Sequence, residues 1–297
     1  MTPEQRADNL RGMVMMVIAV GAFALMDAAL KHLAPHYPPF QVAALRGYAS
    51  LPVVLIWVLV SRSTSQLLRV RWWLHGLRGV IGILMLASFA YGLRTLPLSE
   101  AYAIFFVAPL LITALAAPIL GESVGANRWW AIAIGLVGVF VVLRPGVQML
   151  SIGGIAVLVS TLCYAVSAIT ARVLGRTDSS ASMVFWLMIS IALGATLLTG
   201  SDWRPVRAEH AWTLVSIAVT GSIGQFTITE AFKRGQASLI APLEYTALAW
   251  GLGLDWILWK TLPQPIVLFG ASIVIAGGLF VLWSERRRQP SVIVVVE

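Results

Sequence analysis

Charged side chains are scarce in this 297-residue sequence. Only 11% of the residues are Asp, Glu, Lys or Arg, whereas 59% are hydrophobic, and the mean hydropathy is +0.85. Soluble domains carry about 25% charged residues, so this chain has too few polar side chains to cover a water-soluble globule of its size. The composition therefore excludes an ordinary soluble fold and predicts an all-α integral membrane protein.

Cysteine and histidine are scarcer still. Cys163 is the single cysteine, which excludes an internal disulfide and a cysteine-built metal site. The four histidines (His32, His36, His75 and His210) fall near the ends of expected membrane segments and lack a helical metal-ligand spacing. No nucleophile–base or metal constellation and no G-x-x-x-x-G-K-[ST] phosphate loop is present. We therefore expect no metal, cofactor, catalytic residue or direct ATP drive, and a protein that is not an enzyme.

Positive charge is in excess, with a net charge of +8, but it is spread along the chain. Most basic residues stand singly or in pairs between apolar runs, and the one basic run is Arg286 to Arg288. This placement is typical of anchors that face anionic lipid headgroups, and it excludes a stripe that follows nucleic-acid phosphates.

Ten apolar runs are long enough to cross a bilayer. The first run shows no signal-peptide cleavage site, so it is expected to be retained as a membrane helix. The ten segments cover approximately residues 12–33, 40–60, 72–93, 97–120, 127–143, 151–171, 181–199, 210–231, 236–259 and 264–283.

The connections between these segments differ in positive charge. One set holds thirteen of the cations, including the Arg286 to Arg288 run, the other set holds six, and Arg46 and Arg78 fall inside segments. Because cytoplasmic loops are enriched in Lys and Arg, both termini are expected in the cytoplasm. We expect the protein in a bacterial inner membrane, as a monomer or a homodimer.

The two halves of the sequence resemble each other. Residues 131–146 align with 270–285 at an offset of 139, and residues 26–31 align with 167–172 at an offset of 141. Five segments per half is an odd number, so the second half must cross the membrane in the opposite sense. The sequence thus predicts an inverted repeat, with residues 1–146 and 147–285 as the halves and 286–297 as a tail. Such repeats place a binding site near the midplane between them.

A set of short motifs occurs in a specific order along the chain. These are Asp27-x-x-x-Lys31, Arg46, Arg78-Gly79, the stretch 93–101 leading to Pro109, Gly121-Glu122, and Arg144-Pro145-Gly146. In these motifs the chain resembles the drug/metabolite transporter superfamily, in its EamA-type branch. The resemblance implies a secondary transporter of small metabolites. One departure is Trp259-Lys260-Thr261, where that family often has Gly-Glu before the proline, so no role of that glutamate is transferred.

Charged residues inside the bilayer are costly and are expected to find partners. Asp27, Lys31 and Arg46 fall at one outer depth and predict an ion cluster, either as a static clamp or as a gate. On the inner side, Arg78 and Glu244 fall at similar depths and predict a second pair, with Glu230 near the same level. Breaking these pairs in turn would give the two gates of alternating access.

Glu244 is the carboxylate of greatest interest, because Pro242 interrupts its helix as occurs where a helix lines a cavity. It is interpreted as a site for a proton or a substrate amine, or else as a helix–helix salt bridge. Tyr102, Phe106 and Tyr245 are expected to line the same cavity. Arg78 and two further aromatic side chains inside the segments, Tyr91 and Trp186, complete the predicted substrate site. Asp255 is expected to face the lipid interface.

The combination of buried carboxylates and arginines favours a small amino-acid-like zwitterion or amine as the substrate. Protons are the candidate coupling ion, and membrane lipids surround the protein. A flat nucleoside-like or vitamin-like metabolite is the second hypothesis, and a carboxylate is the third. A lipid flippase or a membrane enzyme is the alternative class.

Overall fold

The computed structural model describes residues 3–60, 67–68, 70–120, 126–143, 151–174, 177–234 and 241–288, and this part of the chain contains helices and turns but no strand. The α-helices are α1 (Pro3–Leu33), α2 (Pro39–Val60), α3 (Trp72–Leu93), α4 (Leu98–Phe105), α5 (Ala108–Leu120), α6 (Ala126–Leu143), α7 (Ile152–Leu174), α8 (Ser180–Thr199), α9 (Ala211–Arg234), α11 (Ala247–Leu254) and α12 (Pro265–Arg288). Shorter turns are η2 (Gly200–Asp202), η3 (Ala208–His210), η4 (Ala241–Thr246) and η5 (Asp255–Trp259).

Helices occupy each predicted apolar segment wherever the structure describes it, but two segments are interrupted. The segment predicted as 97–120 is divided at residues 106–107 into α4 and α5. The segment predicted as 236–259 begins outside the described residues and then runs through a 3-10 turn, an α-helix and a π-helical turn. The interruption expected at Pro242 is therefore confirmed, and the division at residues 106–107 is an addition.

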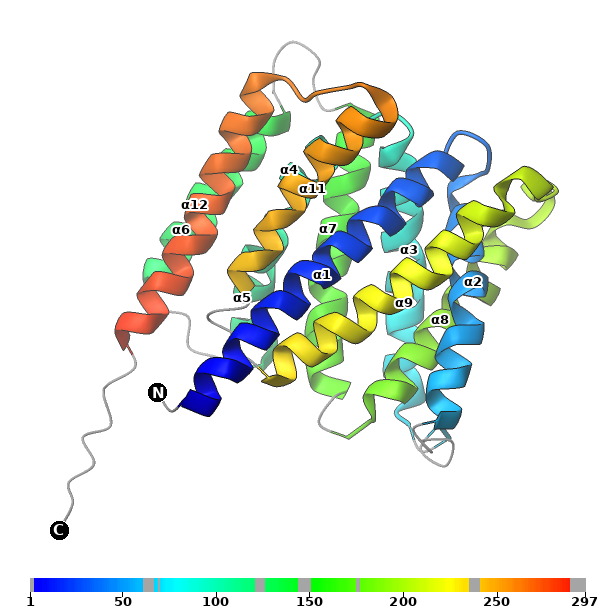
Figure 1. Cartoon of the computed structure of the whole chain (residues 1–297), viewed down its shortest axis with the longest axis horizontal. Coiled ribbons are helices and arrows are strands. Elements are labelled where there is room, and N and C mark those ends of the chain that lie inside the picture. Colours follow the sequence, from blue (N-terminus) through cyan, green and yellow to red (C-terminus); the bar gives the residue numbers. More distant parts are fainter. Residues whose placement is uncertain are drawn as a thin grey trace.

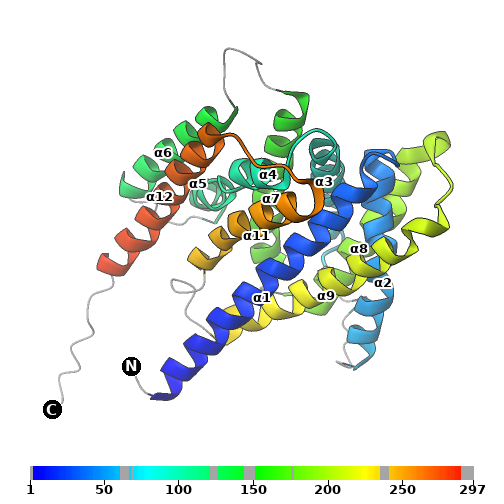
Figure 2. The ribbon, with the colours of Figure 1, turned by 45° about the horizontal axis from the view of Figure 1, so that its top comes forward.

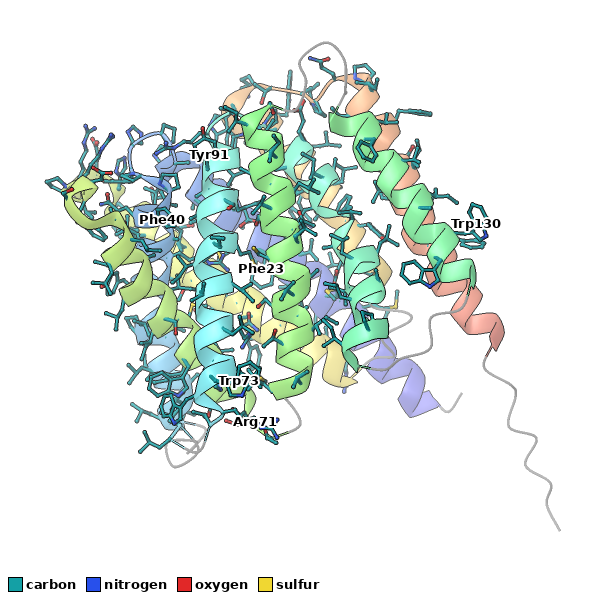
Figure 3. The ribbon with its side chains drawn as sticks, turned by 180° about the vertical axis from the view of Figure 1, so that it is seen from behind. Phe23, Phe40, Arg71, Trp73, Tyr91 and Trp130 are labelled. Carbon is teal, nitrogen blue, oxygen red and sulfur yellow. The ribbon has the colours of Figure 1, made fainter. Side chains whose placement is uncertain are left out.

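The helices pack as pairs that join distant parts of the sequence. The most extensive contacts are α1 with α9, α3 with α7, α2 with α8, and α6 with α12. Figure 1 shows α1, α9, α11 and α12 in one layer, and Figure 3 shows α3, α7 and α6 from the other side. In Figure 2 the α6–α12 pair stands at one edge, with α4, α5 and α11 between it and the other helices. The interrupted helices thus lie in the interior of the bundle.

The outer surface has the character of a lipid-facing surface. Six helical stretches are long and apolar enough to cross a bilayer by length and composition, the first being Leu10–Leu33. Large apolar side chains are exposed on them, such as Leu197 (81% exposed) and Trp212 (82% exposed). Soluble monomers do not expose apolar surface on this scale. The chain is a multi-pass membrane protein.

Candidate functional site

Two interrupted helices face each other in the interior. Helix α4 packs against α11, and both also contact neighbours from the two halves of the sequence. Each interruption lies next to a proline, Pro109 in the first turn of α5 and Pro242 in η4. Proline lacks an amide hydrogen and restricts the residue before it, so the chain leaves regular α-helix at these places. Irregular backbone inside a membrane protein is tolerated where it lines a protein interior or a cavity.

Asp27 on α1 is connected to α4. The Tyr102 hydroxyl donates a hydrogen bond to Asp27 Oδ2 at 2.9 Å, and the charge of Arg46 on α2 acts on the same carboxylate. Tyr102 is buried, whereas Asp27 and Arg46 are partly exposed. The structure therefore places Asp27, Arg46 and Tyr102 together.

Aromatic rings gather around the end of α4 in two contacting groups. Phe106 contacts Tyr245 edge-on with ring centres 5.2 Å apart, and the adjacent Phe105 contacts Tyr164 of α7 at 5.0 Å. Phe89 of α3 extends the wall, 6.0 Å from Phe105. We call Phe89, Phe105, Phe106, Tyr164 and Tyr245 the aromatic wall; it draws on both halves of the chain.

Glu244 lies beside this wall in η4. Its negative charge acts on Tyr164 and Tyr245, which places the carboxylate near both rings. Within the part of the chain that the structure describes, no hydrogen bond or ion pair reaches this half-buried carboxylate. Burying an ionised carboxylate costs free energy unless a hydrogen-bond donor or a cation pairs with it. Glu244 is therefore well placed to bind a cation or a proton.

The predicted pair between Arg78 and Glu244 is wrong. The Arg78 guanidinium donates through Nη1 to the Met183 carbonyl at 3.1 Å, and its Nε is buried without a partner among the described residues. Helix α3, which carries Arg78, packs on α7 and α8, whereas η4 packs on α1, α11 and α12. The two residues share a depth but lie on different elements.

The predicted cluster of Asp27, Lys31 and Arg46 is wrong for Lys31. Its ammonium group pairs with Asp255 Oδ1 at 2.9 Å and lies over the Trp259 ring at 4.2 Å. Asp255 is fully buried, which contradicts its expected position at the lipid interface. The carboxylate also accepts hydrogen bonds from the Leu98 and Ser99 amides and the Ser99 hydroxyl at the start of α4.

Two other predicted site residues, Tyr91 and Trp186, lie away from Glu244. Tyr91 is in the last turn of α3, and Figure 3 shows Tyr91 at the opposite end of the helix from Arg71. Trp186 donates to the Leu67 carbonyl at 2.8 Å and packs against the exposed Trp72, so it belongs to a surface cluster. Glu230 is in α9, but its side chain lies outside the described residues.

The sequence interpretation missed Asp255 and the aromatic wall residues Phe89, Phe105 and Tyr164 as site residues. Asp255 could have been considered from the sequence, because it is a carboxylate within a predicted span. The direction of its side chain could not be predicted, because η5 is a π-helical turn, which is wider than an α-helical turn. Phe89, Phe105 and Tyr164 carry no sequence signal that separates them from ordinary packing residues.

A pocket of about 460 Å³ opens elsewhere, beside the turn between α1 and α2. Its lining is formed by Pro38, Pro39, Arg94, Ser201, Asp202, Trp203 and Arg204. Neither Glu244 nor a residue of the aromatic wall lines this pocket, so the pocket differs from the interior site.

Comparison with known proteins identifies the family of this chain. The EamA-like transporter family matches the chain twice, over residues 10–144 and 151–283. The chain belongs to this family. The two matches cover nearly all of the helical part of the chain.

Similar family members are named as transporters of different metabolites. The pseudopaline exporter CntI of Pseudomonas aeruginosa is 23% identical, with 90% of this chain and 94% of the relative covered. The S-adenosylmethionine uptake transporter of Rickettsia prowazekii is 25% identical, with 95% and 96% covered. The riboflavin transporter of Vibrio cholerae is 26% identical, with 94% and 95% covered. A solved structure described as "Crystal structure of protein" has the same fold, with a TM-score of 0.64, 20% identity, and 96% and 99% of the two chains covered.

Proposed function

We propose that this protein is a secondary transporter that carries a small amine-bearing metabolite, of which an amino-acid-like zwitterion is the first choice, across a bacterial inner membrane. The observation that carries the proposal is the Glu244 carboxylate, which is half-buried among aromatic rings and receives no hydrogen bond or ion pair from the described residues. A substrate ammonium group would supply the missing partner.

The wider chemistry of the site supports a zwitterion. Arg46 lies on the same side of the bundle as Asp27 and Tyr102, and a guanidinium binds carboxylates well. The aromatic wall offers ring faces and edges to an apolar or flat substituent. S-adenosylmethionine, which a relative is named for, combines an amino-acid group with a flat ring, as such a site requires.

Alternating access requires a closure that can open, and the Lys31–Asp255 pair is the candidate on one side. It joins α1 to η5, and Asp255 also holds the start of α4. Its opening would release α4, which carries Tyr102 and leads to Phe106, from η5 and thereby widen the path to Glu244. Protons are the proposed coupling ion, with Glu244 as the group that alternates between substrate and proton.

The arrangement of the halves supports an inverted repeat of residues 1–146 and 147–285. Helix α1 is the first helix of one half and α7 of the other, and they run in opposite directions in Figure 1. The contact between α1 and α9 then corresponds to the contact between α7 and α3, as a two-fold relation requires. We propose ten spans with both termini in the cytoplasm, and α1 starts on the side where α12 ends (Figure 1).

A thermal-shift screen of the purified protein in detergent tests the substrate class. The panel contains zwitterionic amino acids, amines, nucleosides, vitamins and carboxylates. A ligand at 100 times its dissociation constant stabilises the folded state by about 2.7 kcal/mol when it binds only that state. We expect amine-bearing ligands to raise the melting temperature of the wild type, and this effect to be lost in Glu244→Gln.

The matched control is Glu209→Gln, because Glu209 is an exposed carboxylate in η3, 63% exposed at its side chain. This variant keeps the ligand-induced shift. A response to carboxylates alone, or an amine response that survives Glu244→Gln, would overturn the proposed substrate class.

A flat vitamin-like metabolite is the second candidate. The aromatic wall favours it, since rings of α3, α4 and α7 contact one another, Phe106 contacts Tyr245 of η4, and one relative is named as a riboflavin transporter. Stabilisation by riboflavin that is unchanged in Glu244→Gln and lost in Tyr245→Ala would favour this candidate over the first.

A further inference from the structure

Two pairs of residues occupy corresponding places in the two halves. Tyr37 and Asp178 each lie two residues before the second helix of their half, at an offset of 141. The two family matches begin at residues 10 and 151, which is the same offset. Arg71 and Arg207 each follow a valine; Arg71 directly precedes α3, and Arg207 directly precedes η3, which leads into α9.

One residue of each pair contacts one residue of the other pair, Arg71 with Asp178 and Arg207 with Tyr37. We call each of these two contacts, together with a nearby histidine, a brace. In the first brace, the Arg71 amide donates to Asp178 Oδ2 at 3.3 Å, and His75 Nε2 lies 2.8 Å from the same oxygen. In the second brace, the Arg207 amide donates to the Tyr37 hydroxyl oxygen at 3.0 Å, and His210 Nδ1 lies 2.7 Å from it. Each brace fastens the start of a third helix to the first turn of the opposite half.

The braces lie at opposite ends of the bundle. Arg71 directly precedes α3, and Arg94, which follows the 22 residues of that helix, donates to the Tyr37 carbonyl. A helix of this length spans about 33 Å. Figure 3 shows Arg71 at one end of α3, and Figure 1 shows the α1–α2 turn at the other end of the molecule.

The chemistry of the two braces differs. The first brace joins an imidazole to a carboxylate, and both side chains are buried, with 4% and 2% exposed. The shared acceptor of the first brace is a carboxylate oxygen, and a carboxylate only accepts hydrogen bonds, so His75 must supply the hydrogen through Nε2. Adding a proton to an imidazole therefore does not remove the acceptor of the first brace.

The second brace requires a neutral imidazole. Because the Tyr37 oxygen accepts the Arg207 amide hydrogen, its own hydrogen must find an acceptor, and His210 Nδ1 is the acceptor among the described residues. Protonation of Nδ1 removes that acceptor and leaves the hydroxyl hydrogen of the buried Tyr37 without a partner.

The surroundings of His210 also oppose a positive charge. The His36 and His32 rings lie 4.7 Å and 5.7 Å from it, and the charge of Arg207 acts on it as well. Arg204 is anchored next to His36 through the His36 carbonyl. Among the described residues, Glu209 favours a positive charge on His210, with its Oε1 3.9 Å from His210 Nε2. The Glu209 side chain is 63% exposed, so water screens this attraction.

We propose that the Tyr37–His210 brace is a proton-sensitive latch, which opens on acidification, whereas the corresponding Asp178–His75 brace stays closed. The latch adjoins the pocket formed by Pro38, Arg94, Trp203 and Arg204, so its opening loosens the wall of that pocket at one face only. This inference goes beyond the proposed function and does not depend on the identity of the substrate.

Hydrogen–deuterium exchange of the purified protein in detergent tests the latch without any substrate. The Arg207 and Arg71 amides donate directly to the two braces, so peptides that contain them report the braces separately. After correction for intrinsic exchange, we expect the Arg207 peptide to exchange several-fold faster at pH 5.5 than at pH 7.5, because protonation of His210 favours the open form of the brace. The Arg71 peptide changes less than about twofold over the same range.

Two variants make the test specific. Asn carries an oxygen where histidine carries Nδ1, so His210→Asn keeps an acceptor for Tyr37 but cannot titrate, and its Arg207 peptide loses the response to acid. His75→Gln is the matched control and keeps the wild-type response of the Arg207 peptide. An acid response of that peptide that persists in His210→Asn, or that appears equally at Arg71 in the wild type, would overturn the proposal.

Discussion

The carboxylate of Asp255 connects three segments that are far apart in the sequence. It accepts hydrogen bonds from the first residues of α4, belongs to η5, and pairs with Lys31 at the end of α1. Asp27, one turn before Lys31 on α1, receives the Tyr102 hydroxyl from α4. Since the start and the middle of α4 are thus tied to the same stretch of α1, the position of Tyr102 depends on Asp255.

Replacement of Asp255 by alanine is expected to be strongly destabilising. Lys31, 11% exposed at its side chain, would be left without its partner, and removal of one member of a buried ion pair costs about 3–5 kcal/mol. Glu209→Ala is the control, because its pair with Arg207 is exposed and is worth at most about 1 kcal/mol. Thermal unfolding in detergent measures both; equal melting temperatures for the two variants would contradict this role of Asp255.

The hydrogen bonds of Asp178 are expected to make the free energy of unfolding depend on pH. Burial acts to raise the pKa of this carboxyl, but hydrogen bonds from Thr177, His75 and the Arg71 amide outweigh it and hold the pKa below its usual value of 3.8. A depressed pKa in the folded state stabilises the protein fully above the unfolded-state pKa, and the contribution is lost as the pH falls through the folded-state value.

Asp178→Asn is therefore expected to lower stability by about 1.5–3 kcal/mol at pH 7, the usual worth of hydrogen bonds to a charged group. The difference from the wild type should shrink as the pH falls below about 3.8. Thermal unfolding between pH 3 and pH 7 measures it, and a difference that stays constant over this range would show that the carboxylate charge is not responsible.

Single site residues were only partly predictable from the sequence. The position of a residue within a span fixes its level along the helix, and Lys31 and Asp255 do meet at one level. Depth does not fix the direction of a side chain around the helix, and the π-helical turn at Asp255 changes that direction. Depth alone also led to the wrong prediction that Arg78 pairs with Glu244. Helix α3 and the turn η4, which carry these residues, pack against different neighbours.

At the level of elements, the close contact between α4 and α11 depends on a glycine. A Cβ atom at Gly251 would lie 2.9 Å from Tyr102 Cδ2 and 3.3 Å from Ser99 Cα. Tyr102 cannot move aside cheaply, because it is buried and hydrogen-bonded to Asp27. The spacing of the two interrupted helices is thus determined by a single missing side chain.

Gly251→Ala should therefore separate the interrupted helices, at a cost of about 1–3 kcal/mol, and should weaken ligand binding at Glu244. Gly253→Ala in the same helix is the matched control, since nothing lies within 4 Å of its added Cβ, and alanine is favoured over glycine in a helix by about 1 kcal/mol. Thermal unfolding with and without ligand measures both effects. If the two variants behave alike, the contact between α4 and α11 does not set the site.

The apolar runs predicted the helical segments well, because a membrane-spanning helix needs an uninterrupted apolar stretch. Pro242 predicted the irregular turn that contains Glu244. The division between α4 and α5 was not predicted, since residues 106–107 are as apolar as the helices on either side and the run of hydropathy continues through them.

At the scale of the whole molecule, each half depends on the other for its packing. The pairs α1–α9 and α3–α7 cross between the halves, and so do α2–α8 and α6–α12. Short repeats at offsets of 139 and 141 residues predicted two halves. The two family matches begin at residues 10 and 151, which are 141 residues apart. Which helices pair could not be predicted from those repeats, because similarity between two segments does not specify their neighbours.

The most direct test of the account is transport by the purified protein in proteoliposomes. The assay measures counterflow of the amine-bearing ligand that gives the largest thermal shift, for the wild type, Glu244→Gln and Glu209→Gln. Loss of a hydrogen bond to a charged group, about 1.5–3 kcal/mol, corresponds to a decrease of roughly tenfold to a hundredfold in transport efficiency. The account predicts this decrease for Glu244→Gln and wild-type counterflow for Glu209→Gln; equal counterflow in all three would contradict the central role of Glu244.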